Sequence, residues 1–200
     1  VPPVMRDFAD YQRLHTLHDS ARSLVLRVSD RQSGHTRVLK IARDDSPGDT
    51  PRSQHIQAEF ARLRALDHPL IIQVHDLVQT PLGLGYTMDD IDGSALAAVL
   101  DTLPTDPRER LHLLLPLACT LAEALQGVHS AGYSHRDVTP ANIVWNRAHN
   151  HLRLIDFGLS GLDVEQPGEY MPLGSPEGTL RYLAPEQTGR IGRAVDHRSD

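Results

Sequence analysis

Short segments in which apolar and polar residues alternate occupy much of the first ninety residues. This period of two predicts β-strands that bury one face. Ser33-Gly34 supplies the residues of a hairpin turn between two of these strands. The pattern predicts a five-stranded sheet, with strands at Tyr11 to His18, Leu24 to Ser29, Arg37 to Ala42, Leu70 to Val78 and Leu84 to Met88.

Helical periodicity dominates the rest of the chain. Pro107 to Ala131 places apolar residues at i, i+3, i+4 and i+7, and Gly132 follows as a cap. A strand-rich part followed by a mostly helical part predicts an α+β fold. Shorter elements are also predicted, namely helices at Gln54 to Leu66 and Ser94 to Asp101, and strands at Ile143 to Trp145 and Leu152 to Ile155.

The composition is that of a globular domain, with 40% hydrophobic and 23% charged residues among 200. The net charge is −6 and no basic stripe is present, which argues against nucleic acid as a partner. No apolar run approaches about eighteen residues, so no membrane span is predicted, and the Val-Pro-Pro-Val start has no signal-peptide character. The single cysteine, Cys119, lies in an apolar helical run and is predicted to be a small core residue. A cytoplasmic location is the simplest expectation.

Candidate chemistry is concentrated in His135-Arg136-Asp137-Val138-Thr139-Pro140-Ala141-Asn142 and in Asp156-Phe157-Gly158. Phosphoryl transfer needs metal ligands, a base and compensating charge in fixed geometry, with little covalent chemistry from the protein. Asp137 is a candidate to accept the proton of a substrate hydroxyl. Asn142 and Asp156 offer the hard oxygen atoms that Mg²⁺ prefers. The pattern resembles the catalytic loop and the metal-binding segment of protein kinases.

Two further motifs stand at kinase-like intervals. Lys40 resembles the strand lysine that holds the α- and β-phosphates of ATP, and Glu59, in a predicted helix, is its expected ion-pair partner. The run from Gly178 to Glu186 ends in Ala-Pro-Glu and resembles the end of an activation segment. Because all these motifs occur in kinase order, the resemblance implies a bilobed protein-kinase-like fold that uses ATP and Mg²⁺.

The resemblance narrows to a bacterial group. It rests on Glu177 to Tyr182, on Pro185 to Arg190 and on Val195 to Asp200. Members of this group are N-terminal serine/threonine kinase domains of very large signalling proteins, which add an ATPase module, a GAF domain and often a histidine kinase. The resemblance covers about Tyr11 to Asp200 and implies C-terminal domains as partners. It also implies an N-lobe at residues 1–88, a hinge at 89–93 and a C-lobe at 94–200 that is truncated near Asp200.

Catalytic and binding roles follow from the same resemblance. The implied catalytic residues are Lys40, which positions the phosphates; Glu59, which orients Lys40; Asp137, which handles the hydroxyl proton; Asn142 and Asp156, which hold Mg²⁺; and Thr179, which shapes the acceptor site. The implied nucleotide contacts are Val25, Val38 and Val144 around the adenine, Met88 as gatekeeper, Asp89 and Ile91 in the hinge, and the hydroxyls of Ser20 and Ser23.

Supporting residues are expected as well. Asp200 stands where kinases carry the aspartate that anchors the catalytic loop. His135 is expected to pack beneath Phe157 and not to act as a base. Glu186 is expected to lack its usual arginine partner, which in kinases lies further along the chain.

Two departures from the kinase pattern leave alternatives open. His18, Ser20 and Ser23 stand where kinases place glycines over the phosphates, and Thr139 replaces the lysine that usually follows the catalytic aspartate. The leading hypothesis is an ATP-dependent serine/threonine protein kinase in bacterial signal transduction, acting on protein substrates. The alternative is a pseudokinase, a regulatory module with little or no transfer activity. A small-molecule phosphotransferase is disfavoured, because that class lacks an activation segment ending in Ala-Pro-Glu.

Overall fold

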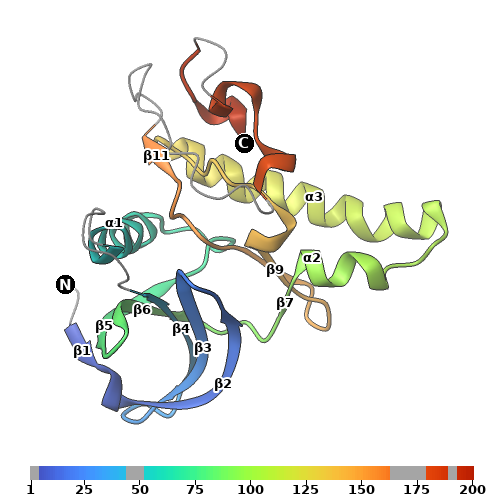
Figure 1. The fold of residues 1–200 in the computed structure, drawn as a ribbon. Helices are drawn as coiled ribbons and strands as arrows, with labels where there is room; N and C mark the ends of the chain where they lie inside the picture. The colour runs from blue at the N-terminus through green and yellow to red at the C-terminus, as the bar shows by residue number, and fades with distance from the viewer. Residues whose placement is uncertain (1–4, 44–51, 163–178, 189–192) are drawn as a thin grey trace. The chain divides into compact units, whose positions relative to one another are not determined.

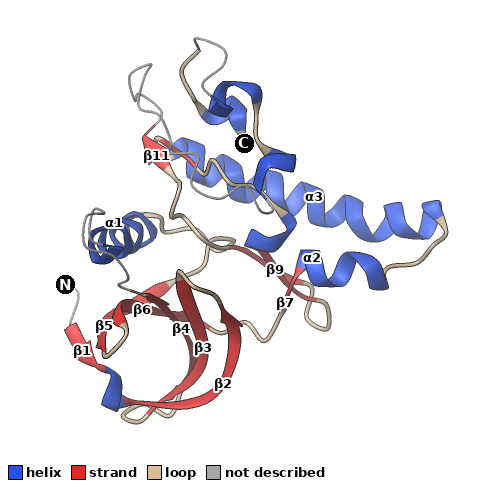
Figure 2. Cartoon of the chain, viewed as in Figure 1, coloured by secondary structure: helices blue, strands red, loops and turns tan. Residues whose placement is uncertain are grey.

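Two compact units make up the chain in the computed structural model, which describes residues 5–43, 52–162, 179–188 and 193–200 (Figure 1). The first unit comprises Val1–Asp67 and Ile72–Asp92, and the second comprises His68–Ile71 and Gly93–Asp200. Figure 2 shows that strands dominate the first unit, which also holds one helix of 14 residues, whereas the longest helix and most short helical turns belong to the second. The α+β class predicted from the sequence is confirmed.

The first unit is built on a six-stranded sheet with the strand order β1-β5-β6-β4-β3-β2. All neighbours in it are antiparallel except β1 and β5, which are parallel. A 3₁₀ turn, η1 (Phe8–Asp10), joins the first two strands. The strands are β1 (Met5–Asp7), β2 (Tyr11–Asp19), β3 (Ser23–Asp30), β4 (Thr36–Ala42), β5 (Val74–Thr80) and β6 (Gly83–Asp89).

The sheet corrects the prediction in two places. Five strands were predicted, but β1 adds a sixth that is only three residues long, too short to show alternation. Its Arg6 side chain is held by Asp30, with Nη1 and Oδ2 separated by 2.8 Å. The strand predicted from Leu70 begins only at Val74. Leu70 and Ile71 belong to the second unit, where they pair with Leu154.

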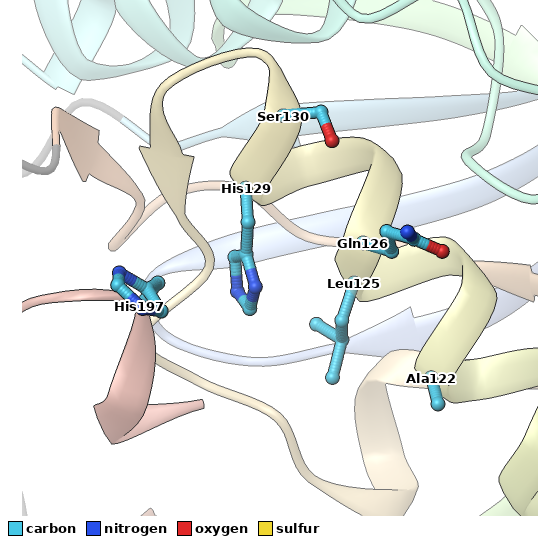
Figure 3. Close-up of a pocket in the computed structure, with 6 residues that line it drawn as sticks. All are labelled: Ala122, Leu125, Gln126, His129, Ser130 and His197. Carbon is cyan, nitrogen blue, oxygen red and sulfur yellow. The ribbon is translucent and has the colours of Figure 1, made fainter.

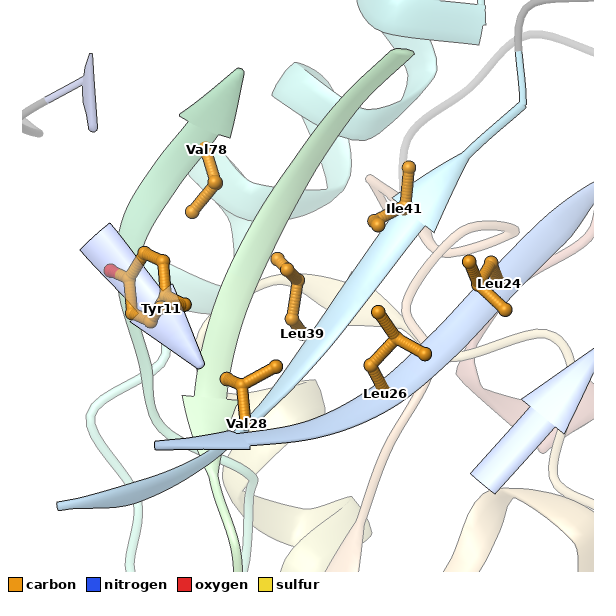
Figure 4. Close-up of a cluster of buried hydrophobic side chains, with 7 residues drawn as sticks. All are labelled: Tyr11, Leu24, Leu26, Val28, Leu39, Ile41 and Val78. Carbon is orange, nitrogen blue, oxygen red and sulfur yellow. The ribbon is translucent and has the colours of Figure 1, made fainter. Parts of the chain in front are cut away.

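Alternation along β3 separates the two faces of the sheet, as the sequence predicts. In β3 every second residue is buried, and β4 pairs with it so that Leu26 lies opposite Leu39. These side chains form a core whose members point toward one another in Figure 4. The positions between them, including Val25 and Lys40, lie on the opposite face. The core comprises Tyr11, Leu24, Leu26, Val28, Leu39, Ile41 and Val78.

Helix α1 (Arg52–Ala65) contacts β4, β5 and β6 and confirms the predicted helix within two residues at each end. Its buried residues are Ile56, Glu59, Phe60 and Leu63. Three of them are apolar, as a helix packed on a sheet requires. Glu59 is the exception, since it is charged and only 3% exposed. A buried carboxylate needs partners, and this position is therefore a candidate functional one.

The second unit contains helix α3 (Pro107–Ser130), which packs against two short strands, β8 (Tyr133–Ser134) and β10 (His151–Leu154). Its start is fixed by Asp106, whose carboxylate accepts from the amides of Arg108 (2.9 Å) and Glu109 (3.0 Å), with proline in the first turn. The remaining elements are β7 (Ser94–Ala95), α2 (Leu96–Val99), η2 (Leu100–Thr102), η3 (Pro140–Asn142), β9 (Ile143–Asn146), β11 (Gly161–Leu162), η4 (Thr179–Tyr182), η5 (Pro185–Thr188) and η6 (His197–Ser199).

The predicted core position of Cys119 is wrong, because its thiol is exposed. Helix α3 buries Leu117, Ala124 and Val128, which share one face. Cys119 lies two residues from Leu117, about 200° around the helix, and so points away from that face. Among the described residues, α3 is also the one helix long and apolar enough to cross a membrane by length and composition. A single helix of this kind is weak evidence for a span, since core helices of soluble proteins pass the same test.

Replacing Asp30 by asparagine is expected to lower the free energy of unfolding by about 1 kcal/mol at pH 7, because Arg6 loses a charged hydrogen-bond partner. The hydrogen bond from Arg6 holds the pKa of Asp30 well below its usual range, with help from the amides of Gln32 and Ser33. A pKa depressed by folding adds stability above the unfolded pKa of about 4, and this is lost as the pH falls toward the folded pKa. Urea denaturation of parent and variant measures it: the gap should narrow steadily from about pH 5 to about pH 2. A gap that does not change with pH contradicts the assignment.

Candidate active site

An ion pair between Lys40 and Glu59 is formed inside the first unit. The Lys40 ammonium lies 2.8 Å from Oε1 and 3.1 Å from Oε2 of Glu59. The Lys40 side chain is 16% exposed and that of Glu59 is 4% exposed. Lys40 comes from the middle of β4 and Glu59 from the sheet-facing side of α1, so strand and helix packing together fix the pair. The structure thus brings together two residues that the sequence places nineteen positions apart.

The predicted adenine contacts of the first unit share one face of the sheet with Lys40. Val25 lies opposite Lys40 across β3 and β4, and Val38 lies opposite Met88 across β4 and β6. Paired residues project to the same side, so these side chains form an apolar surface beside the ammonium. Val25 and Val38 are half-buried, and Met88 is buried. An apolar face next to a cation suits a flat base attached to phosphates.

Ser20 and Ser23 close the turn between β2 and β3. The Ser20 hydroxyl donates to the Ser23 carbonyl (3.1 Å), and the Ser23 amide donates to the Ser20 hydroxyl (3.1 Å). The two hydroxyls also lie 3.3 Å apart. These contacts between the two serines stabilise the turn. Their predicted contact with phosphates stays a prediction.

The predicted hinge carries several ion pairs to the sheet. Asp89 accepts from Arg37 (3.0 Å) and contacts the Nε2 atom of His75 (2.7 Å), while Arg27 pairs with Asp90. These contacts use the side chains of the segment and fix its path along β3, β4 and β5. Backbone contacts from Asp89 and Ile91 to an adenine stay a prediction.

In the second unit, the side chains of Asp137 and Asn142 meet. The Asn142 amide nitrogen donates to the backbone carbonyl of Asp137 (2.9 Å) and to its Oδ2 (2.8 Å). Pro140 starts the 3₁₀ turn η3 that carries Asn142. The backbone amide of Asn142 donates to the Thr139 carbonyl and so closes this turn. Because both donor hydrogens face Asp137, the side-chain oxygen of Asn142 is oriented away from it.

Asp156 lies next to Asn142 through the backbone of Ile155, the residue before it. The Ile155 amide donates to the Asn142 carbonyl (2.9 Å). The backbone of Asp156 is left-handed (φ 64°), an unusual conformation for an aspartate that is held partly by a bond from the Gly158 amide (3.2 Å). Two oxygen-bearing side chains, Asn142 and Asp156, therefore come from adjacent strand ends. This donor set fits Mg²⁺, which takes one or two protein oxygens together with phosphates and water.

In the described ranges, no group of three or more His, Cys, Asp or Glu side chains is placed to hold a metal ion.

His135 is a packed scaffold residue, as predicted. It is fully buried, and its ring meets that of Phe157 edge-on at 4.5 Å between centroids. Burial lowers the pKa of His135 and keeps the ring neutral. Its Nε2 donates to the Ile155 carbonyl (3.1 Å), while Nδ1 accepts from the Asp137 amide (3.3 Å). His135 thus links the segment before Asp156 to the loop that carries Asp137.

Asp200 anchors the loop that carries Asp137, as the sequence predicts. Its carboxylate is completely buried and accepts from the amides of His135 (2.7 Å) and Arg136 (2.6 Å). It also contacts the Nε2 atom of His129 in α3 (2.8 Å). Arg136 has a left-handed backbone (φ 67°), and Asp200 helps to hold it in that conformation.

The expectation that Glu186 lacks its usual arginine partner stays a prediction, but Glu186 does accept a hydrogen bond from the Ser199 hydroxyl (2.6 Å). This hydrogen bond lowers the pKa of Glu186. The next residue, Gln187, makes a contact that the sequence did not predict. Its side-chain amide donates to the Arg136 carbonyl (2.7 Å). No local pattern identifies Gln187, since its partner lies 51 positions away.

The remaining predicted residues are placed only in part. Val144 is half-buried in β9, and Thr139 is buried at the position where kinases carry lysine. Thr179 begins η4, but its side chain lies outside the described residues. The roles assigned to all these residues stay predictions.

One open pocket of about 590 Å³ in the second unit contains none of the predicted site residues. Figure 3 shows His129 and Gln126 of α3 on one side and His197 on the other. The pocket is shallow and carries no argument for the chemistry.

Comparison with known proteins identifies the family. The protein kinase domain family matches residues 11–200, and the chain belongs to that family. Its fold is therefore the bilobed α+β protein kinase fold, which confirms the predicted class.

Bacterial serine/threonine kinases are among the proteins that this chain resembles. The chain is 34% identical over 192 residues to the DNA damage-responsive serine/threonine-protein kinase RqkA of Deinococcus radiodurans, covering 95% of this chain and 28% of the relative. It is 34% identical over 168 residues to PknB of Mycolicibacterium smegmatis (82% and 26%) and 29% identical over 170 residues to pkn2 of Myxococcus xanthus (84% and 20%). The chain thus spans between 20% and 28% of the length of these relatives.

Replacing Asp200 by alanine is expected to destabilise the second unit by about 2–4 kcal/mol, since the buried amides of His135 and Arg136 lose their acceptor. Hydrogen exchange at these two amides should accelerate, and thermal unfolding should shift downward. Asp101→Ala, at an exposed aspartate of the same unit, is the matched control and should change neither quantity. Unchanged protection of both amides in Asp200→Ala contradicts the anchoring role.

Proposed function

We propose that this chain transfers the γ-phosphoryl group of ATP to serine or threonine hydroxyls of proteins, as part of bacterial signal transduction. The closed ion pair between Lys40 and Glu59 carries the proposal, because a buried glutamate of this kind is otherwise costly. The braced pair of Asp137 and Asn142 supports it. Membership of the protein kinase family supplies the reaction class.

Each side chain has a defined task in this proposal. Lys40 binds the α- and β-phosphates while Glu59 holds its ammonium in place. Asp137 orients the substrate hydroxyl and takes its proton, and the amide of Asn142 keeps the Asp137 carboxylate turned toward that hydroxyl. Asn142 and Asp156 hold Mg²⁺, which neutralises phosphate charge when bound. Thr179 is proposed to shape the site that receives the hydroxyl.

The nucleotide base belongs with the apolar residues. Met88, Val25 and Val38 share the face of the sheet that carries Lys40, and we place the adenine against them. Val144 is proposed to contact it as well, with backbone groups of Asp89 and Ile91 at its edge. Ser20 and Ser23 are proposed to border the phosphates through the turn that they close.

Thr139 affects the rate more than the reaction type. It stands where kinases place a lysine that balances the charge of the transferring phosphoryl group. Losing one preorganised donor of this kind costs on the order of 10²–10³ in rate. We therefore expect slow phosphoryl transfer. What distinguishes this chain from a module without activity is that it keeps Lys40, Asp137, Asn142 and Asp156.

The wider setting belongs to the proposal too. We assign residues 1–88 to the N-lobe, 89–93 to the hinge and 94–200 to the C-lobe of the kinase domain. The relatives are several times longer than this chain, which fits a kinase domain joined to C-terminal signalling domains. ATP as phosphoryl donor and an exposed free thiol at Cys119 fit the cytoplasm.

Asp137→Asn is expected to lower phosphoryl transfer at least a thousandfold, because the hydroxyl loses its proton acceptor while nucleotide binding is untouched. The measurement is ³²P transfer from ATP·Mg²⁺, by the full-length protein, to itself and to a generic basic protein. Asp101→Asn is the matched control and should retain the parental rate. ATP binding without any transfer that the substitution abolishes would favour the pseudokinase and end the proposal.

Asp156→Asn is expected to raise the Mg²⁺ concentration that gives half-maximal transfer by about tenfold or more, because one charged metal ligand becomes neutral. A Mg²⁺ titration of transfer, with a calorimetric titration of ATP in EDTA beside it, separates metal binding from nucleotide binding. Affinity for metal-free ATP should stay within about twofold of the parent. An unchanged Mg²⁺ requirement contradicts the metal-binding role.

A further inference from the structure

Tyr86 lies directly opposite Lys40 on the neighbouring strand of the sheet. In the antiparallel pairing of β4 and β6, the Cα partner of Lys40 is Tyr86. Side chains at paired positions project to the same face and lie close to each other. Tyr86 is only 1% exposed and is among the largest fully buried side chains of the described residues.

The hydroxyl of Tyr86 is bonded to the carboxylate that pairs with Lys40. It donates to Oε1 of Glu59 at 2.9 Å, and the same oxygen lies 2.8 Å from the Lys40 ammonium. Oε2 receives a further contact from Lys40 at 3.1 Å. Two strands and one helix thus meet at a single buried carboxylate.

This hydrogen bond acts on the orientation of Glu59. Hydrogen bonds to a buried ionised group are stronger than those between neutral groups, and they fix the side-chain rotamer. An ion pair alone leaves the carboxylate free to rotate about its last bond. With the tyrosine hydroxyl bound to Oε1, Glu59 keeps one oxygen fixed while Lys40 contacts both.

The ring of Tyr86 has a separate role, which is purely structural. It packs against Phe60 of α1 with 6.0 Å between ring centroids. Phenylalanine would provide the same apolar contact without a hydroxyl. The hydroxyl is therefore the part of this residue that packing does not require.

We propose that Tyr86 is a positioning residue of the active site, whose hydroxyl holds Glu59 in the orientation that presents the Lys40 ammonium to the nucleotide phosphates. The inference rests on the proposed kinase function and adds a residue that acts through Glu59, without itself touching the nucleotide. With this inference, the ion pair of Lys40 and Glu59 in the first unit becomes a triad that includes Tyr86.

The test compares Tyr86→Phe with the parent in the full-length protein. We expect kcat/KM for ATP to fall about tenfold, which is the effect of losing one hydrogen bond to a charged group. Circular dichroism and thermal unfolding establish that the variant is folded. Tyr86→Met, which fills the space with a flexible apolar side chain, gives a second route to the same loss of the hydroxyl.

Tyr11→Phe is the matched control. Tyr11 is also buried in the first unit, and its hydroxyl contacts a carboxylate, that of Asp76, at 3.3 Å. This variant removes a bond of the same type that has no contact with Glu59. It should change thermal stability but leave kcat/KM for ATP at the parental value.

A double-mutant cycle with Glu59→Gln distinguishes positioning from general packing. If Tyr86 acts through the Glu59 carboxylate, the tenfold loss in Tyr86→Phe shrinks to less than about twofold when Glu59 is already glutamine. The comparison is made on transfer and on ATP·Mg²⁺ affinity, because Glu59→Gln itself slows transfer. A full tenfold loss in the glutamine background overturns the inference.

The outcomes separate this inference from the function on which it rests. A parent protein that transfers phosphate, with Tyr86→Phe equal to it, overturns the role of Tyr86 and leaves the kinase proposal standing. A parent that shows no transfer sensitive to Asp137→Asn ends both. Tyr11→Phe losing as much activity as Tyr86→Phe also overturns the inference, since the effect would then be a general loss of stability.

Discussion

A buried carboxylate with several partners organises each unit of this protein. Burying an ionised group is costly unless neighbours supply hydrogen bonds and opposite charge. Glu59 meets this requirement with Lys40 and Tyr86, and so ties α1 to the centre of the sheet. Asp200 meets it with the amides of His135 and Arg136. In both cases the same contacts that make burial tolerable also orient residues assigned to catalysis.

The loop around Asp137 depends on such contacts because its backbone is strained. Arg136 and Asp156 both adopt left-handed conformations, which non-glycine residues rarely hold without support. Asp200 holds the amide of Arg136 and Gln187 holds its carbonyl, while Gly158 and the packed ring of His135 support the region of Asp156. These contacts therefore hold the groups proposed for metal binding and proton transfer in fixed positions.

Much of the fold and of the site could be predicted from the chain. The alternation of β3 and β4 and the periodicity of α1 and α3 reflect local rules, so these elements were correctly expected. The order of the kinase-like motifs also predicted three contacts correctly, namely Lys40 with Glu59, His135 with Phe157, and Asp200 with the loop before Asp137. Errors fell where long-range pairing decides: the sixth strand β1 and the late start of β5.

The sequence by itself determined the elements, the order of the motifs and the chemical groups of the site, because these depend on residue type and spacing. Only the tertiary structure decided that Tyr86 stands opposite Lys40, that Ser199 bonds Glu186, and that Cys119 is exposed. Strand register and helix rotation settle such contacts. Both result from the packing of distant segments, which no local pattern records.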